Sequence, residues 1–310
     1  MRRPKGFAPS PDRGQIASPQ MDGDDLVAAI FLMSPMERRK FLHIHNSWPR
    51  FFYKFRAFSN EDRLRSQMVG NEIFLSSPRD FNDPFDMRGM LVIKGGIDAL
   101  IRKYKALPMS KAVRRKAIKD ARNGVKAEGL EGYVSRVFRP LNQFDEMIME
   151  QGVHCFASRD KKVRSSGPRS NLMWSHYGDS HKGYCLQYSV HADPVFVGSV
   201  RVGYASEYPV INWLSDSFPN DVLRCVTQKD KCWEYENEWR YIKPNSARQL
   251  LSVSGSGIKS VIIGAEATPA SIELVMQIAQ ERDSLMGIKT NVFLAKRSKT
   301  QYRLGFSKLR

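Results

Sequence analysis

The stretch from Asn171 to Ser189, NLMWSHYGDSHKGYCLQYS, constrains the fold of this chain more than any other segment. From Gly183 onward, alternate residues separate into two sets, which predicts a strand with two distinct faces. Before Gly183 lies a dense set of reactive side chains, namely Trp174, Ser175, His176, Tyr177, Asp179, His181 and Lys182. Because pockets often form where loops meet strand ends, the segment predicts a binding or catalytic pocket, or else a buried aromatic core with a satisfied histidine.

Short alternating segments recur along the chain and predict further strands. We expect strands at 50–58, Glu72–Ser76, Val153–Ser158, Val200–Tyr204, Gly257–Gly264 and Asn291–Ala295. Helical spacing of apolar residues predicts helices at Asp62–Val69 and Thr268–Asp283. Since the strands outnumber the clear helices and do not alternate with them regularly, the sequence predicts an α+β fold built on a mixed, largely antiparallel sheet.

One helical segment interrupts this pattern of strands. Residues from about 96 to 150 have helical spacing, so we expect them to form a basic helical lobe inserted into a single α+β domain of residues 50–295. Residues 1–25 carry four prolines and scarcely any apolar periodicity, which predicts a disordered basic arm. The remaining segments are expected to be a helical lead-in at 26–49 and a basic tail at 296–310.

The charge of the chain favours a polyanionic partner. With a formal net charge of +17 and a pI near 9.8, nucleic acid is expected as the partner rather than a membrane surface. The excess is concentrated in Ile101–Pro140, which holds twelve basic and three acidic residues. Such a run is either a solvated helix face or a polyanion-binding surface. The predicted nucleic-acid-binding residues are Arg114, Arg115, Lys116, Lys119 and Arg122.

Several features bear on compartment and metal content. No apolar run approaches the length of a transmembrane helix, and the first residues lack the apolar core of a signal peptide. Four cysteines without a CxxC pair are typical of a reducing compartment, so we expect a cytoplasmic protein. The spacing of the cysteines and histidines matches no structural zinc pattern, and we expect no metal cofactor.

A second informative window, KCWEYENEWRYI, spans Lys231–Ile242. As a strand it places Trp233, Tyr235 and Trp239 on a buried face, and Glu234, Glu236, Glu238 and Arg240 on the opposite face. This opposite face is expected either to be exposed to solvent or to line a pocket. Like charges on one face repel, so we expect cations near these glutamates. In the earlier loop SSPRDFNDPFDM, Asn82, Asp83 and Asp86 predict either an Asx turn or part of a ligand-binding loop.

Four motifs recur in the order found in one known family. They are YKFR at Tyr53–Arg56, FNDPFD at Phe81–Asp86, LMWSHYGDSHKGYC at Leu172–Cys185 and WEYENEWR at Trp233–Arg240. With these motifs the chain resembles the bacterial domain-of-unknown-function family numbered 2971 over most of residues 50–265. The family name implies no activity, so this resemblance leaves the function open.

The order Arg56, Ser158 and Glu236-Asn237-Glu238 is similar to that of ADP-ribosyltransferases of the Arg-Ser-Glu type. This resemblance implies NAD as a substrate, with Arg56 at its pyrophosphate, Ser158 in the nicotinamide pocket and Glu238 at the oxocarbenium-like centre. It also implies that Glu238→Gln abolishes turnover and leaves the fold intact. The implied catalytic residues are Glu238, Glu236 and His176, and the implied cofactor-binding residues are Arg56, Ser158, Tyr53, Trp174, Ser175, Tyr177 and Asn82.

Two other functions stay open. A metal- or histidine-dependent hydrolase, such as a nuclease, would use His176 or His181 as a general base with neighbouring carboxylates such as Asp83 and Asp86. A non-catalytic protein would bind nucleic acid through the basic lobe and the tail. Every catalytic hypothesis predicts that Arg56, Ser158, Trp174–Tyr177 and Glu238 converge around one cleft, with Arg56 and Glu238 neutralising each other.

Overall fold

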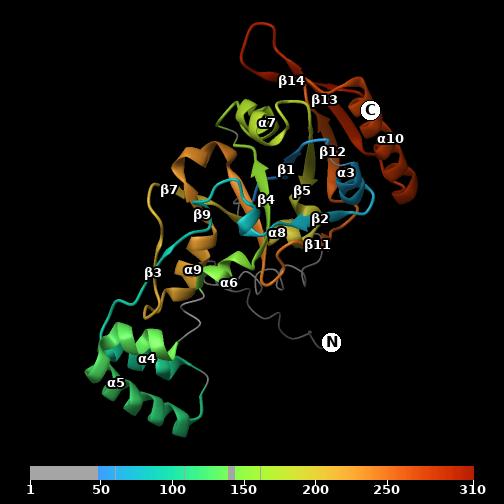
Figure 1. Cartoon of the computed structure of the whole chain (residues 1–310). Coiled ribbons are helices and arrows are strands. Elements are labelled where there is room, and N and C mark those ends of the chain that lie inside the picture. Colours follow the sequence, from blue (N-terminus) through green and yellow to red (C-terminus); the bar gives the residue numbers. More distant parts are fainter. Residues whose placement is uncertain (1–47, 60, 108, 139–143, 161) are drawn as a thin grey trace, which may run out of the picture. The chain divides into compact units, whose positions relative to one another are not determined.

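A central sheet of eight strands organises the residues that this computed structural model describes, which are 48–310 without 60, 108, 139–143 and 161 (Figure 1). In spatial order the strands are β14 (Leu304–Lys308), β13 (Asn291–Arg297), β12 (Ile258–Ile263), β5 (Tyr184–Ser189), β1 (Phe51–Arg56), β4 (Gly152–Ser158), β10 (Glu238–Lys243) and β6 (Val200–Arg201). Neighbouring strands run antiparallel, except that β12 and β13 are parallel. The predicted α+β fold with a mixed, largely antiparallel sheet is therefore confirmed.

The described chain also contains shorter sheets and several helices. The two-stranded sheets pair β2 (Glu72–Leu75) with β11 (Gln249–Ser252), β3 (Met90–Val92) with β8 (Val210–Asn212), and β7 (Gly203–Ala205) with β9 (Gln228–Asp230). The α-helices are α3 (Glu61–Met68), α4 (Ile97–Ala106), α5 (Lys111–Val137), α6 (Phe144–Met149), α7 (Asn171–Tyr177), α8 (Pro194–Val197), α9 (Phe218–Val226) and α10 (Pro269–Met286). No helix in this part of the chain combines the length and hydrophobicity needed to cross a bilayer.

Both faces of the central strands are buried by aromatic side chains. On one face the ring of Phe52 stacks on Phe156 at 4.9 Å and lies 5.5 Å from Trp239, so that β1, β4 and β10 share one aromatic layer. On the other face Phe55 meets the edge of Trp174 from α7 at 5.1 Å. Because apolar groups cover both faces, the sequence of β1 is aromatic at four of its six positions.

The predicted basic helical insertion is confirmed and has its own apolar core. Leu100 and Tyr104 of α4 pack with Ala121, Tyr133 and Val134 of α5, and Trp213 and Leu214 close the same cluster. Helix α5 changes direction at Gly129, whose φ of 78° lies in the left-handed region that glycine adopts without strain. The lobe therefore folds around buried side chains of α4 and α5 together with Trp213 and Leu214, and most basic residues of α5 lie at exposed positions.

Some predicted segments differ from the structure or lie outside it. Residues 296–310, expected as a tail, continue β13 and return as β14, which pairs with β13 at one edge of the central sheet. The single strand expected at Val200–Tyr204 is two strands, because β6 joins the central sheet and β7 pairs with β9. The basic arm at 1–25 and almost all of the lead-in at 26–49 lie outside the described residues.

Candidate active site

The central sheet splits between β1 and β4. Strand β1 pairs with β5 along its whole length, but its register with β4 ends after Phe52 opposite Ser158 and Tyr53 opposite Ala157. Beyond that point the Lys54 side chain enters the gap, and its Nζ donates a hydrogen bond of 2.6 Å to the Cys155 carbonyl oxygen of β4. A side-chain amine thus satisfies a strand carbonyl at the point where the ladder has stopped.

A cavity of about 320 Å³ lies at this split. Its walls come from β1, β4, the segment 76–86, α7, Lys229 of β9 and the two glutamates Glu236 and Glu238. This volume is at the lower end of the range of small-molecule sites in proteins. Because antiparallel partners share a face, Tyr53, Ala157 and Glu238 lie on one face of the sheet, while Lys54 and Arg56 start from the other.

The window Lys231–Ile242 does not form the single strand predicted from its alternation. Lys231–Glu236 is a 3-10 helix, Asn237 follows in the left-handed conformation with φ 45°, and only then does β10 begin at Glu238. The reversal at Asn237 buries Glu236 and Glu238 and leaves Trp233 half-buried. The prediction that all three aromatics are buried was therefore wrong, because only Trp239 is buried, whereas Glu236 and Glu238 line the cavity, which is one of the two alternatives expected for the glutamate face.

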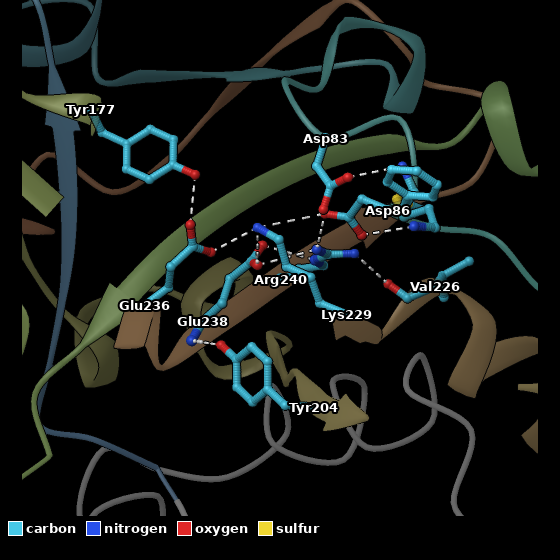
Figure 2. A network of polar contacts seen from close by, with 11 residues as sticks. Asp83, Asp86, Tyr177, Tyr204, Val226, Lys229, Glu236, Glu238 and Arg240 are labelled. Atoms are coloured by element: carbon cyan, nitrogen blue, oxygen red, sulfur yellow. Dashed lines mark hydrogen bonds and ion pairs between the residues drawn. The ribbon is translucent and has the colours of Figure 1, made fainter. Parts of the chain in front are cut away.

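A buried ionic network surrounds these two glutamates (Figure 2). Arg240, on the same strand face as Glu238, donates to its carboxylate at 2.8 and 3.1 Å and to Asp86 at 2.7 Å. Lys229 donates to Glu236 at 2.8 Å and lies 3.5 Å from Glu238 and 3.7 Å from Asp86. The cations expected near the glutamates are therefore Lys229 and Arg240, and Arg56 is not the ion-pair partner of Glu238.

The network shifts the pKa values of its two glutamates in opposite directions. Burial by itself would raise the pKa of the Glu238 carboxyl, but Arg240 and Lys229 outweigh burial and hold this pKa well below its usual range. For Glu236, burial and the negative charge of Glu238 raise the pKa, and Lys229 and Tyr177 only partly oppose them. Glu238 is consequently a fixed charge, whereas Glu236 is the carboxylate that holds a proton more readily than an ordinary glutamate.

Helix α7 brings Tyr177 and His176 from the WSHY motif to the cavity wall. Ser170 caps this helix by accepting a hydrogen bond from the Met173 amide, which fixes the position of its first turn. The Tyr177 hydroxyl donates a 2.6 Å hydrogen bond to the Glu236 carboxylate. The exposed His176 ring lies 6.2 Å from both the Trp233 and the Tyr235 rings. The motif therefore supplies a hydroxyl directly to the network and an imidazole at its edge.

Lys54 and Arg56 give the cavity cationic groups of a different kind. In the described part of the chain neither side chain forms an ion pair with a carboxylate, and the buried Nε of Arg56 has no hydrogen-bond partner. Burial lowers the pKa of the Lys54 amine to about 7, and the positive charge of Arg56 acts in the same direction. One side of the cavity is therefore lined by Lys54 and Arg56, which have no carboxylate partner among the described residues. The other side is lined by carboxylates that are paired with Lys229 or Arg240.

The other predicted site residues are distributed as follows. Tyr53 and Asn82 line the cavity, and the Tyr53 hydroxyl accepts a hydrogen bond from Gln187. Ser158 lies outside the lining, where its hydroxyl donates to the backbone carbonyl of Asn237 and accepts from the side-chain Nδ2 of Asn237. Ser175 is exposed and not in the lining. Trp174 is fully buried in the core and donates to the Pro168 carbonyl. The structure thus brings Arg56, His176, Tyr177, Glu236 and Glu238 to one cavity, while Ser158, Trp174 and Ser175 do not line it.

The loop that contains Asn82 combines both roles considered for it. The Asp83 carboxylate accepts a hydrogen bond from the Phe85 amide, which is the Asx turn that the Asn-Asp-Pro sequence predicts. Asp86, three residues later, accepts from Arg240 and lines the cavity. The turn therefore positions Asp86 as the third carboxylate of the network.

The basic residues of α5 fall into two groups. Arg114 is turned inward and donates to the carbonyl oxygens of Leu107 and Met109, which places it in the packing of the lobe. Arg115, Lys119 and Arg122 are exposed at spacings of four and three residues, and the exposed Lys126 continues the same helix face. Lys116 is exposed beside this face. Of the residues predicted to bind nucleic acid, Arg114 is therefore the one whose side chain packs within the lobe itself.

Comparison of the chain with protein-family models, with curated proteins and with solved structures found no match. The two resemblances drawn from the sequence motifs therefore stay predictions.

Sequence reasoning missed Lys54 and Lys229 as parts of the site. The signal for Lys54 was a single lysine between Tyr53 and Phe55 in a strand that is otherwise aromatic, because a charge buried in such a strand needs a special environment. Lys229 gave no comparable signal. Its contacts with the network depend on where the fold places β9, which pairs with β7, and this placement is a property of the tertiary fold.

Proposed function

We propose that the cavity in the split sheet is an active site that binds NAD and breaks its bond between ribose and nicotinamide. The observation that carries the proposal is one cavity lined by Lys54 and Arg56, which have no carboxylate partners among the described residues, and by Glu236, whose pKa burial and Glu238 raise. An anionic ligand supplies the missing partners for the cations. A carboxylate of raised pKa supplies a group that takes up a proton during the reaction.

The roles of the residues follow from their positions. Arg56 holds phosphate oxygens, which a fixed guanidinium fork binds well, and the Lys54 amine beside it donates hydrogen bonds to the same anion. As the ribose C1′–N bond breaks, its electron pair leaves with nicotinamide. The oxygen of water or of an acceptor hydroxyl then bonds to C1′ and gives its proton to Glu236. Tyr177 orients the Glu236 carboxylate for this transfer through its 2.6 Å hydrogen bond.

Glu238 has a different role from the one that the resemblance implied. Its carboxylate is engaged by the Arg240 guanidinium and by Lys229, and it is 3 % exposed. Its charge is therefore already neutralised by partners within the protein, and the proposal assigns the proton transfer to Glu236. Glu238 then holds Arg240 and Lys229 in place.

The hydrolase alternative with a metal ion receives less support from the same contacts. Asp86, Glu236 and Glu238 each have Lys229 or Arg240 within ion-pair distance, so a divalent cation would compete with an ammonium or a guanidinium for them. Among the described residues, no group of three His, Cys, Asp or Glu side chains has an arrangement suited to holding a metal. His181 does not line the cavity, and its ring stacks 6.2 Å from Trp174.

A second proposed function is docking of nucleic acid on α5. The exposed stripe Arg115, Lys119, Arg122 and Lys126 extends about 16 Å along the helix at 1.5 Å per residue. Within the described residues, no carboxylate forms an ion pair with these four side chains. Such a row of uncompensated cations favours contacts with phosphates and therefore binding that does not depend on base sequence.

Incubation of the full chain with NAD labelled in the nicotinamide and in the adenylate part tests the proposed reaction. We expect free nicotinamide, together with the second label either in ADP-ribose or on an added nucleic acid or protein. Glu236→Gln and Arg56→Gln should lose this activity, whereas Glu234→Gln, on an exposed residue of the same 3-10 helix, should keep it. The absence of released nicotinamide with every acceptor would contradict the proposal.

A further inference from the structure

Lys54 occupies a position that a lysine rarely has. It comes from the middle of an otherwise largely aromatic strand, reaches into the split between β1 and β4, and lines the cavity. Its Nζ donates a hydrogen bond of 2.6 Å to the Cys155 carbonyl oxygen. A neutral amine can donate that hydrogen bond and still keep its lone pair available, so this contact does not require the amine to be charged.

Lys229, in the wall of the same cavity, provides an internal comparison. Three carboxylates lie between 2.8 and 3.7 Å from its Nζ, and together they outweigh burial and raise its pKa above the usual value for lysine. Lys54 has no carboxylate at ion-pair distance in the described part of the chain, and burial followed by the charge of Arg56 lowers its pKa to about 7. Of these two amines, only that of Lys54 is substantially unprotonated at neutral pH.

Arg56, two residues further along β1, complements this amine. Its side chain lines the cavity on the same strand face as Lys54, and its buried Nε has no hydrogen-bond partner among the described residues. A guanidinium in this state binds an anionic group such as a phosphate. The two residues therefore place a nucleophilic amine beside an anion-binding group.

We propose that Lys54 is a nucleophile that forms an imine with the carbonyl carbon of an anionic aldehyde or ketone held by Arg56. The amine nitrogen bonds to the carbonyl carbon, the carbonyl oxygen leaves as water after taking up protons, and a C=N bond remains. No oxidant or reductant takes part in this step. The proposal does not require NAD cleavage. The open-chain aldehyde of released ADP-ribose is one suitable partner, and that particular link rests on the proposed function.

The surroundings of Lys54 determine how this reaction depends on pH. The charged and titratable groups around it are Arg56 on its own strand, His154 and Cys155 on β4, and Glu236 and Glu238 across the cavity. At pH 7 the free-amine fraction of a group with a pKa of about 7 exceeds that of an ordinary lysine by roughly a thousandfold. Imine formation at Lys54 should therefore approach its plateau near neutral pH, while exposed lysines react only in more alkaline solution.

Pyridoxal 5′-phosphate is a suitable probe because it carries both an aldehyde and a phosphate. The full chain is mixed with this probe at pH 7, the imine is reduced with borohydride to a stable secondary amine, and the labelled peptide is identified by mass spectrometry. We expect the fastest labelling at Lys54, about tenfold or more above any exposed lysine. Pyridoxal, which lacks the phosphate, should label Lys54 more slowly, and Arg56→Gln should remove this difference.

Two variants keep the result interpretable. Lys54→Arg should abolish the fast labelling and Lys54→Gln should do the same without a positive charge, each being checked for an intact fold by circular dichroism. Fast labelling that persists in both variants, or labelling of Lys54 no faster than that of exposed lysines, would overturn the proposal. Because the assay uses no NAD, its outcome is independent of the test for nicotinamide release.

Discussion

Tyr177 and Glu236 are 59 residues apart in sequence, and a 2.6 Å hydrogen bond joins the hydroxyl of one to the carboxylate of the other. The bond connects α7, which carries the WSHY motif, to the 3-10 helix ahead of β10, which carries the Glu-Asn-Glu motif. The two most informative stretches of the sequence therefore meet at this contact.

Replacing Tyr177 with Phe should shift the pH dependence of the reaction. The Tyr177 hydroxyl donates to the carboxylate and so favours its ionised form, which lowers the pKa of Glu236. Without this donor the pKa rises further, so the ionised base is lost at a higher pH and the acidic limb of the rate profile should move upward. Measurement of kcat/KM against pH checks this, with Tyr235→Phe as the control because the buried Tyr235 hydroxyl has no partner among the described residues. An unshifted limb in Tyr177→Phe would argue against Glu236 as the base.

The two buried glutamates should respond differently to loss of their charge. Glu238→Gln removes the anion that faces the buried Arg240 guanidinium, and such a loss costs about 3–5 kcal/mol of unfolding free energy. Glu236→Gln removes a charge that burial and Glu238 disfavour, so its cost should stay below about 1 kcal/mol. Urea unfolding at pH 7 distinguishes the two, with Glu234→Gln as a surface control. An equal loss of unfolding free energy in both variants would show that the network does not shift the pKa values of Glu236 and Glu238 apart.

Lys54 should make the stability of the protein depend on pH. Because its folded pKa of about 7 lies below the unfolded value of about 10.4, the unfolded chain binds more protons between these values and stability rises with pH. Below pH 7 both states are protonated, and the full cost of the buried charge is present. Lys54→Met should therefore stabilise the protein more at pH 6 than at pH 9, by at least about 1 kcal/mol. Denaturant unfolding at both pH values is the measurement, and Lys259→Met, on an exposed lysine of β12, should show no such difference.

The stripe on α5 should determine how strongly nucleic-acid binding depends on salt. Each phosphate contact contributes about 0.9 to the slope of log K against log salt for a duplex, so a variant without four of them should have a slope smaller by about 3 to 4. The variant replaces the four exposed side chains with Gln, namely Arg115→Gln, Lys119→Gln, Arg122→Gln and Lys126→Gln. A control of equal charge uses exposed lysines outside the lobe and the 296–310 segment, namely Lys182→Gln, Lys243→Gln, Lys259→Gln and Lys289→Gln. An equal reduction of the slope in both variants would indicate a general effect of charge and no interface on α5.

The sequence predicted local structure well where one period dominates a segment. The alternation after Gly183 predicted β5, and the helical spacing after Thr268 predicted α10, whose first turn Thr268 caps. The prediction failed at Lys231–Ile242, because the alternation of aromatics and glutamates indicates one continuous strand, whereas the chain forms a 3-10 helix of about three residues per turn up to Glu236 and the left-handed backbone at Asn237 separates this helix from the strand. Asn tolerates that conformation well, so Asn237 between two glutamates was the available clue.

The candidate site was less predictable than the fold because it depends on pairing between distant segments. That Glu238 and Arg240 share a strand face follows from their spacing of two residues, and this ion pair was within reach of the sequence. Strand β1 separates from β4 after two residue pairs, so that Lys54 contacts the Cys155 carbonyl. This separation follows from the tertiary packing of both strands. No local pattern in β1 or β4 predicts where their shared ladder ends.

The short ladder between β1 and β4 also has a mechanical consequence. Among the described residues, only two pairs, Phe52 with Ser158 and Tyr53 with Ala157, join the strands from β14 to β1 with those from β4 to β6 in the central sheet. Rotation about these pairs would widen or narrow the cavity while every other ladder of the sheet stayed intact. The hydrogen bond from Lys54 to the Cys155 carbonyl then also joins the two halves of the sheet. A ligand that reacts with Lys54 would break this hydrogen bond and allow the two halves to rotate.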